Sequence, residues 1–459
     1  MQFHGIPKIV LFLILSLLLM TPLAARAGNE TPPSEEPMLS LDEAVKIALK
    51  SNRDIQSASL GVGRSKNSVS AAKSARYPQV SVGAKQSNVL TPQDFMVNAG
   101  ALGTYPGIGP IPSETRSIGQ ISGSTTMVSL ELEQPITSLY KANMNVGAQK
   151  AQLGIASEGE RSQRQMVVQN VKQSYFEMLN YQNSLTATRD SLKFLTDLRR
   201  VVNNQVGQGT ALKTDLLQVN SQLAETRYQE SALADQLITL KQKFNILLGR
   251  SIETPFSIAL PENFQQQLGE QEDLASLEAI AAKQRPEILQ SALQISQAEY
   301  QREVQRFDWY PDIGLYASYL NQSNSGILPG NMAFAGIKGQ WAVLDWGRRD
   351  NQVAGQSKAV EQAKKQSEQV RDQVMTEVSS SWRKLGLIRS RQEADKAALD
   401  AAEENFRITN NRFKEKLALT KDVLQSQAQF SQARQQYQKS LMDEAAVRAE
   451  IDRVTGRNP

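Results

Sequence analysis

The feature that most constrains this chain is an internal duplication. The pair Tyr77-Pro78 recurs as Tyr310-Pro311, and the run Thr214–Gln218 recurs, at a somewhat shorter offset, as Lys421–Gln425. A helical run precedes each Tyr-Pro pair, and alternating apolar residues follow it. Internal repeats indicate copies of one structural unit. We therefore expect two halves of one design that differ mainly in the length of the loop after the first Tyr-Pro pair.

The duplication divides the chain into five segments. Lys8, the apolar run 9–20 and the Ala25-Arg26-Ala27 site are typical of a cleaved secretory signal. The lack of cysteine excludes a lipid anchor on an N-terminal cysteine. The expected segments are a signal peptide at 1–27, a loose tether at 28–38, a first repeat at 39–249, a bridge at 250–272 and a second repeat at 273–456.

Each repeat is expected to contain, in order, a helix, a strand, a loop, a strand, a long helix, a turn and a helix. Alternation such as Val80, Val82 and Ala84, or Ile337, Trp341 and Val343, predicts strands of about 10–12 residues, the length of a membrane strand. The Gly/Pro-rich tract 91–120 is expected to be a loop on the cell exterior. Helices are expected near 41–75, 141–205, 211–248, 274–307, 347–413 and 419–455. The two longest, 141–205 and 347–413, contain no proline. Heptad spacing in the 211–248 helix predicts coiled-coil packing, and its residues are Leu233, Leu237, Leu240, Phe244 and Leu247.

Composition removes most catalytic chemistry. The chain has no cysteine, and its one histidine, His4, lies in the expected signal peptide. Nucleophile–histidine pairs and His/Cys metal sites are therefore excluded from the mature chain, and we expect no enzyme, no cofactor and no metal. No phosphate-binding loop of the GxxxxGK[ST] type occurs. The net charge of +4 is dispersed along the chain, so no nucleic-acid surface is expected.

Four membrane strands per chain cannot close a barrel, because about eight strands is the smallest barrel known. An open strand edge in lipid leaves backbone groups unpaired at a cost of several kcal/mol each. The chain must therefore oligomerise. Two, three or four copies would supply 8, 12 or 16 strands, and the long helices would continue the tube into the periplasm.

The duplicated openings LDEAVKIALKSNRDI and LEAIAAKQRPEIL, the two Tyr-Pro pairs and the closing helices TDLLQVNSQLAETR and KDVLQSQAQFSQAR make the chain resemble the TolC family of outer-membrane efflux proteins, over essentially all of 39–456. The resemblance implies an α+β membrane protein in which three protomers share a transmembrane β-barrel and a coiled-coil periplasmic tunnel. It also implies a passive duct for efflux or type I secretion in the outer membrane, working with a periplasmic adaptor and an inner-membrane pump. The cargo is not specified.

The resemblance also suggests candidate site residues. Family members narrow the tunnel at its periplasmic end with inward acidic residues; Asp422 aligns with one such position, and Gln425 stands where some relatives have a second acid. The turns at that tip contain Gly207 and Gly209 in the first repeat, whereas Lys416 replaces the usual glycine in the second. The candidates for the strand starts and the interfacial aromatic girdle are Tyr77, Pro78, Trp309, Tyr310 and Pro311.

Three alternatives stay open from the sequence. Asp422, like Asp215, lies in a first helical turn, where the helix dipole favours an acid without any pore role. Trp309 and Tyr310 lie at a helix–strand junction, where ordinary packing also explains them. A periplasmic coiled-coil adaptor is the alternative function, although an adaptor normally has one helical hairpin rather than two.

Overall fold

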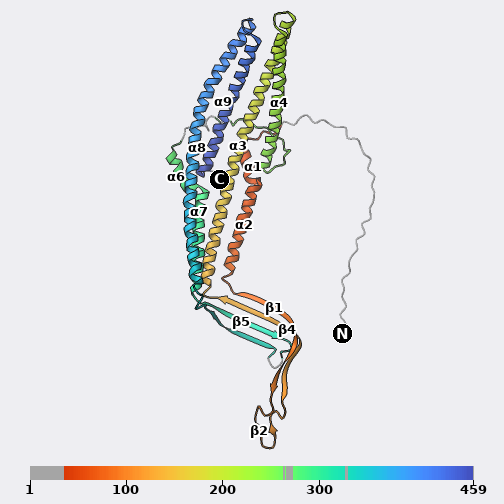
Figure 1. The fold of residues 1–459 in the computed structure, drawn as a ribbon, viewed down its shortest axis with the longest axis vertical. Coiled ribbons are helices and arrows are strands. Elements are labelled where there is room, and N and C mark those ends of the chain that lie inside the picture. The colour runs from red at the N-terminus through yellow and green to blue at the C-terminus, as the bar shows by residue number, and fades with distance from the viewer. Residues whose placement is uncertain (1–35, 262–263, 265–271, 326–328, 458–459) are drawn as a thin grey trace, which may run out of the picture.

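The molecule is a long rod of helices that ends in a β-sheet (Figure 1). The computed structural model describes residues 36–261, 264, 272–325 and 329–457. The expected signal peptide and residues 28–35 of the expected tether lie outside these described residues, as does much of the expected bridge.

Helices make up the rod. Two of them are 69 and 67 residues long, which at about 1.5 Å per residue corresponds to roughly 100 Å each. Each long helix is accompanied by three shorter helices of its own repeat that follow one another along its length (Figure 1). The helices are α1 (Leu41–Ser51), α2 (Arg53–Ser74), α3 (Leu139–Gly207), α4 (Lys213–Leu247), α6 (Leu274–Gln284), α7 (Pro286–Arg306), α8 (Arg348–Lys414) and α9 (Thr420–Thr455), with a 3-10 turn at Phe307–Trp309.

Local sequence fixes where these helices begin. The Ser40 hydroxyl accepts the Glu43 N–H, while the Glu43 carboxylate accepts the Ser40 N–H, so the two residues form a capping box at the start of α1. Pro286 is the first residue of α7, a position at which its missing N–H costs nothing.

The element bounds repeat as the sequence predicts. Helix α6 has the same length as α1 and is offset from it exactly as the second Tyr-Pro pair is from the first, and β5 begins at that same offset from β1. The start of α9 is offset from the start of α4 as Lys421 is from Thr214, and the end of α8 is offset in the same way from the end of α3. The strands in question are β1 (Gln79–Val97), β4 (Arg116–Pro135), β5 (Asp312–Gln322) and β6 (Asn331–Gln340).

These four strands form one antiparallel sheet in the order β1-β4-β5-β6, so the hairpin of each repeat lies beside that of the other. One face is apolar and the other polar, as alternation predicts. The apolar face includes Val80, Val82, Ala84, Val128, Leu130, Leu132, Leu315, Ala317 and Ile337, and the polar face includes Gln79, Ser81, Lys85, Glu131, Glu133 and Lys338.

Strand length was predicted correctly for one hairpin only. Strands β5 and β6 have 11 and 10 residues, but β1 and β4 have 19 and 20. The expected loop 91–120 is therefore mostly strand: β1 runs to Val97, β4 starts at Arg116, and the tip holds a small hairpin of β2 (Thr104–Tyr105) and β3 (Gly109–Pro110). The long ribbon continues past the shorter hairpin and forms the far end of the rod (Figure 1).

Two further expectations are corrected. Strand β6 ends at Gln340, which pairs with Asp312, the first residue of β5, so Trp341 and Val343 lie beyond the strand that was predicted to contain them. Residues 36–38 of the expected loose tether are held in place, because Pro37 accepts the Ser257 N–H and Glu36 forms a 2.7 Å ion pair with Lys241.

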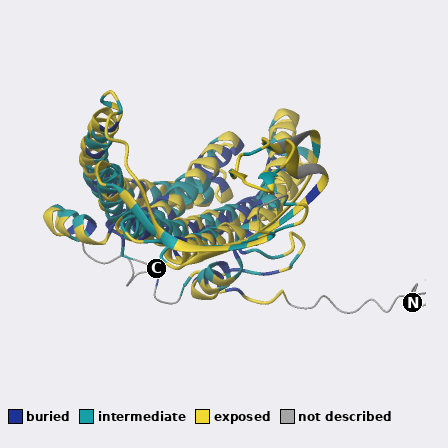
Figure 2. Cartoon of the chain, turned by 90° about the horizontal axis from the view of Figure 1, so that it is seen from below, coloured by how far each residue is buried: buried dark blue, intermediate teal, exposed yellow. Residues whose placement is uncertain are grey.

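Buried apolar residues are spread along the rod in three clusters. One surrounds Tyr175 and Phe244, one surrounds Leu195 and Val423 near the hairpin turns, and one surrounds Leu277 and Val378. Viewed along the rod, the elements lie on an arc, and buried residues alternate with exposed ones around it (Figure 2). The chain thus has the curved shape of a wall segment.

Candidate functional site

The tip turns lie at the end of the rod farthest from the sheet (Figure 1). Gly209 in the α3–α4 turn has a φ of 70°, and Lys416 in the α8–α9 turn has a φ of 63°. In both turns the N–H of the left-handed residue donates to a carbonyl near the end of the preceding helix, and the N–H of the next residue donates to a carbonyl one step further back. Lys416 therefore keeps the backbone of a glycine turn at a cost of about 1–2 kcal/mol. Gly207 is the exposed last residue of α3.

Asp422 and Asp215 make the same local contact. The Asp422 carboxylate accepts the Leu419 N–H at 3.1 Å, and the Asp215 carboxylate accepts the Leu212 N–H at 3.1 Å. Each acid thereby satisfies a free N–H at a helix start. Both carboxylates lie in half-buried residues at the tip, and Gln425 is exposed one turn further along α9. This helix-start contact is by itself enough to explain why an acid stands at position 422. The role of Asp422 as an aperture residue stays a prediction.

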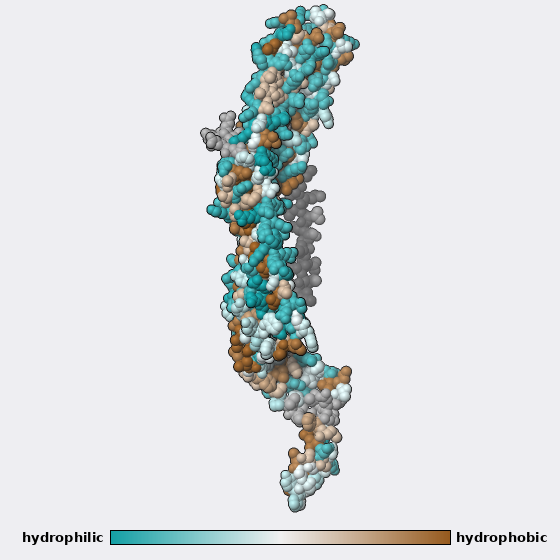
Figure 3. Space-filling model, turned by 60° about the vertical axis from the view of Figure 1, so that its left-hand side comes forward, coloured by the Kyte–Doolittle hydropathy of each residue, from teal (hydrophilic) through white to brown (hydrophobic). Residues whose placement is uncertain are grey.

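The strand starts lie together where the helices meet the sheet. Tyr77 and Tyr310 are 67% and 62% exposed, each beside its proline, Pro78 or Pro311. Trp309 is partly packed: the Arg349 guanidinium lies 4.4 Å from its ring, and its carbonyl accepts the Trp341 indole N–H at 3.2 Å. Hydrophobic residues gather on the surface at this level (Figure 3). Trp309 is still 45% exposed, and Tyr310 stacks on Phe307 with the ring centroids 4.8 Å apart, so both residues combine packing with exposed surface. The girdle role of these residues stays a prediction.

Midway along the rod, the first repeat has a break between α1 and α2. Asn52 is buried there; its side-chain oxygen accepts the N–H groups of Asp54 and Ile55, and its amide donates to the Leu247 carbonyl at 2.8 Å. The end of α4 approaches so closely that a Cβ on Gly249 would lie 2.1 Å from the Ser51 carbonyl oxygen. The α1–α2 break and the end of α4 are thereby locked together beside α3.

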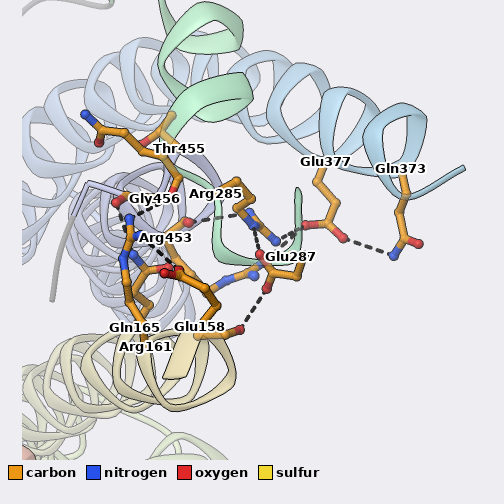
Figure 4. A network of polar contacts seen from close by, with 12 residues as sticks. Glu158, Arg161, Gln165, Arg285, Glu287, Gln373, Glu377, Arg453, Thr455 and Gly456 are labelled. Atoms are coloured by element: carbon orange, nitrogen blue, oxygen red, sulfur yellow. Dashed lines mark hydrogen bonds and ion pairs between the residues drawn. The ribbon is translucent and has the colours of Figure 1, made fainter. Parts of the chain in front are cut away.

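The second repeat makes the same junction with charges (Figure 4). Arg285, only 2% exposed, sits in the α6–α7 break; its guanidinium contacts Glu287 at 2.6 Å and Glu377 at 2.7 Å and donates to the Arg453 carbonyl at 3.4 Å. Gly456 ends α9 with a φ of 77°. The α3 helix joins this network through further hydrogen bonds, which run from Arg161 to the Gln284 carbonyl, from Ser162 to Glu287 and from Gln165 to the Gly456 carbonyl.

The electrostatics of this network favour charged groups. Burial by itself raises the pKa of the Glu287 carboxyl, but the charge and hydrogen bond of Arg285, together with the Ser162 hydroxyl, outweigh burial and hold that pKa below its ordinary value. The sequence predicted one continuous helix near 41–75 and another near 274–307, so the breaks at Asn52 and Arg285 were both missed, together with the network. The available signal was a charged residue at a helix break, placed next to Pro286.

The described residues contain no group of three or more His, Cys, Asp or Glu side chains that could hold a metal ion. None of the helices in the described ranges combines the length and the hydrophobicity that a membrane crossing needs.

Comparison with known proteins then decides the family. The profile of the outer membrane efflux proteins matches residues 44–250 and 279–457, which is most of the chain. The chain belongs to this family. Its fold is that of an outer-membrane channel subunit, and it is not an enzyme. Family membership favours a channel over the periplasmic adaptor that the sequence left open.

Two named relatives are similar in sequence. The outer membrane efflux protein BepC of Brucella suis is 22% identical over 79% of this chain and 74% of its own length. The alkaline protease secretion protein AprF of Pseudomonas aeruginosa is 25% identical over 43% of this chain, and that match spans only 41% of AprF.

Solved structures share the fold. The outer membrane protein VceC of Vibrio cholerae has a TM-score of 0.71 at 15% identity, covering 91% of this chain and 96% of that one. The outer membrane channel CmeC of Campylobacter jejuni has a TM-score of 0.74 at 16% identity, covering 91% and 85%. The α+β architecture predicted from the sequence, long helices joined to a β-domain, is therefore confirmed.

Proposed function

We propose that three copies of this chain form one passive duct across the outer membrane. The observation that carries the proposal is the antiparallel sheet with two open edges, β1 and β6, on a curved wall segment. Four strands from each of three copies would close a barrel, and the long helices would line a tunnel continuous with it. The chain itself needs no energy source for transport, because a partner protein supplies the energy.

The division of the chain follows from this arrangement. Residues 39–249 and 273–456 serve as two wall units joined by the bridge 250–272, and 1–27 directs export and is removed. The mature chain carries no lipid on an N-terminal cysteine. The sheet end lies in the outer membrane, the ribbon tip around 98–115 faces the exterior, and the helices project into the periplasm.

The tip turns are the entrance of the duct. There the chain meets a periplasmic adaptor and an inner-membrane pump, with Gly207, Gly209 and Lys416 in the contacting turns. Asp422 from three copies forms an acidic ring near the threefold axis, with Gln425 beside it. AprF is named for protease secretion and BepC for efflux, so the cargo is either a secreted protein or a small molecule.

Planar-bilayer recording of the detergent-extracted protein tests the duct and its entrance together. We expect discrete conductance steps with a preference for cations. Asp422→Asn should lower that preference, most clearly at low salt, where screening is weak. Asp215→Asn is the matched control, because it removes the same cap from the other turn. Absence of conductance in a correctly folded protein would contradict the duct, and equal effects of the two variants would remove Asp422 from the aperture.

A further inference from the structure

The two edge strands of the sheet, β6 and β1, each have one side without a strand partner in the described part of the chain. Building on the proposed trimer, we propose that β6 of one copy pairs antiparallel with β1 of the next in a single register, with Gly339 opposite Ala84. In this register the segment 341–344 completes β6. The partner is a second copy of this chain, and the internal duplication identifies the residues that meet.

The first step maps one repeat onto the other. Gln79 opens β1 and pairs with Glu133, and Asp312 opens β5 and pairs with Gln340. Because Gln79 and Asp312 are equivalent, Glu133 and Gln340 are equivalent as well. The remaining residues of β1 and β5, and those of β4 and β6, follow in step from these two matched pairs.

The second step uses the pairing of β4 with β5, which already joins the end of one repeat to the start of the next. Leu132 lies opposite Ala317 in that pairing. Leu132 maps to Gly339, and Ala317 maps to Ala84. If the step from repeat to repeat is the same between copies as within a copy, Gly339 lies opposite Ala84 of the neighbouring copy, and the ring closes with six similar steps.

The third step concerns the residues after β6. Strand β4 continues through Pro135, opposite Gly314, and the Ile136 N–H then donates to the Ile313 carbonyl at 2.9 Å. The equivalent of Ile136 is Val343, and the equivalent of Ile313 is Val80. The Val343 N–H thus donates to the Val80 carbonyl of the neighbouring copy, and β6 extends past Gln340.

Side-chain pattern agrees with this register. Trp341 and Val343 come out on the apolar face of the sheet, where they lie opposite Val82 and Val80 of the neighbour. These four side chains are 56%, 71%, 73% and 63% exposed in the single chain, so each has surface to bury. Aromatic and β-branched pairs of this kind stabilise neighbouring strands.

One pair of facing side chains is unfavourable in this register. Lys338 lies opposite Lys85 of the neighbour on the polar face, and like charges in that position are unfavourable. Lys338 has an acidic neighbour at 3.8 Å, Glu133 of its own chain. A shift of two residues would separate the lysines but would displace the attached helices by about 6.6 Å along the strand. The helices of neighbouring copies would then meet at a different level from α3 and α7 within the chain, where Gly154 meets Leu293, and the six steps around the ring would no longer be alike.

Disulfide trapping tests the register directly, because the chain contains no cysteine of its own. The double variant Lys338→Cys with Lys85→Cys should form a reversible covalent link between copies, since opposed residues lie within disulfide reach. Two matched controls report registers shifted by two residues in either direction. They are Lys338→Cys with Ser87→Cys, and Gln340→Cys with Ser81→Cys, whose partners would lie about 7–8 Å apart.

Non-reducing gels give the linked fraction, and light scattering in detergent gives the mass of the same samples. Efficient linking of Lys338→Cys with Lys85→Cys alone is the expected result. A trimer linked best in either control overturns the register while leaving the proposed trimer intact. A monomer by light scattering overturns the trimer itself.

A charge reversal at Lys85 gives a second test of the register that does not depend on a disulfide. Lys85→Glu should place an acid opposite Lys338 and shift upward the temperature at which the trimer dissociates in SDS. Lys85→Gln removes only the repulsion and should give a smaller shift. Equal dissociation temperatures for Lys85→Glu and Lys85→Gln would overturn the register.

Discussion

The two helix breaks midway along the rod solve one structural problem with different chemistry. In the first repeat, buried Asn52 caps α2 and donates to the end of α4 without any charge. In the second, buried Arg285 donates to the end of α9 and forms ion pairs with two carboxylates, those of Glu287 and Glu377. Both breaks need a side chain that satisfies the last carbonyls of the adjoining helix. The two breaks share one backbone geometry and differ only in the side chain that hydrogen-bonds to these carbonyls.

The comparison also shows what each solution requires. A neutral cap is self-contained, because one amide meets a carbonyl and two N–H groups. A buried guanidinium must keep its partners, since a carboxylate left alone in a buried site is strongly unfavourable. The second junction should therefore be more sensitive than the first to loss of its capping side chain and to acid.

The largest effect is expected for Arg285→Ala. It leaves Glu287 and Glu377 without the buried guanidinium and removes the hydrogen bond to the end of α9. Both carboxylates are 32% exposed and Glu377 keeps Arg453 at 3.8 Å, so the cost should lie at the lower end of the about 3–5 kcal/mol that a fully buried pair would give. The matched change Asn52→Ala removes a helix cap and should cost about 1–2 kcal/mol. Hydrogen exchange at the Arg457 and Arg250 amides, which lie at the two helix ends, measures local opening of each junction. Similar losses of protection in the two variants would show that charge makes no difference.

A large effect is also expected for Gly249→Ala. The added Cβ would meet the Ser51 carbonyl oxygen at 2.1 Å, and the φ of 73° is strained for alanine. In Gly456→Ala the nearest atoms, of Gln284, lie at 2.9 Å, so the α6–α7 break has less far to move. The midpoint temperature of thermal unfolding should fall further for Gly249→Ala than for Gly456→Ala. The opposite order would mean that the second junction is the tighter of the two.

Lowering the pH should produce a smaller difference in stability between the two junctions. The pKa of Glu287 is lower in the folded chain than its ordinary value of 4.5. A carboxyl with a depressed folded pKa contributes stability above its unfolded pKa and loses it as pH falls through the folded pKa. Exchange protection at Arg457, corrected for intrinsic rates, should therefore fall below about pH 4.5, while protection at Arg250 should change less. Parallel pH profiles would contradict the charged-junction description.

The smallest effect is a gain. Lys416→Gly should relieve the left-handed lysine in the α8–α9 turn and stabilise that turn by about 1 kcal/mol. The reverse change in the other repeat, Gly209→Lys, should lose about the same amount, because no neighbour lies within 4 Å of a Cβ at that position. Exchange of the Leu417 and Thr210 amides reports on the two turns. No change in either turn would mean that the backbone strain is relieved elsewhere.

The sequence predicts the periodic parts of this molecule well. Proline-free runs predict the long helices, and the shared offsets predict the matching starts of α1 and α6. The lengths of β1 and β4 were missed, because Pro92 within β1 and Gly123 within β4 interrupt the alternation on which strand prediction depends. Strand β6 was predicted too long for a single chain, since Trp341 and Val343 have no partner on β5.

Part of the candidate site could also be predicted from sequence. The tip turns and the helix-start acids follow from local rules, and the structure shows Asp422 and Asp215 in matching contacts. The Arg285 network could not be predicted, because its members come from α3, α7, α8 and α9 and only the folded chain brings them together. Spacing along a helix gives no information on which distant helix will supply a charge partner.

The central claim is that the two repeats of each chain are equivalent wall units and that three chains continue them into one tube. Electron microscopy of the detergent-solubilised assembly, viewed end-on along the helices, tests it most directly. We expect a threefold ring of six helical hairpins, α3–α4 and α8–α9 alternating, around one central channel. A ring with another number of hairpins, or hairpins of the same kind side by side, would contradict the claim.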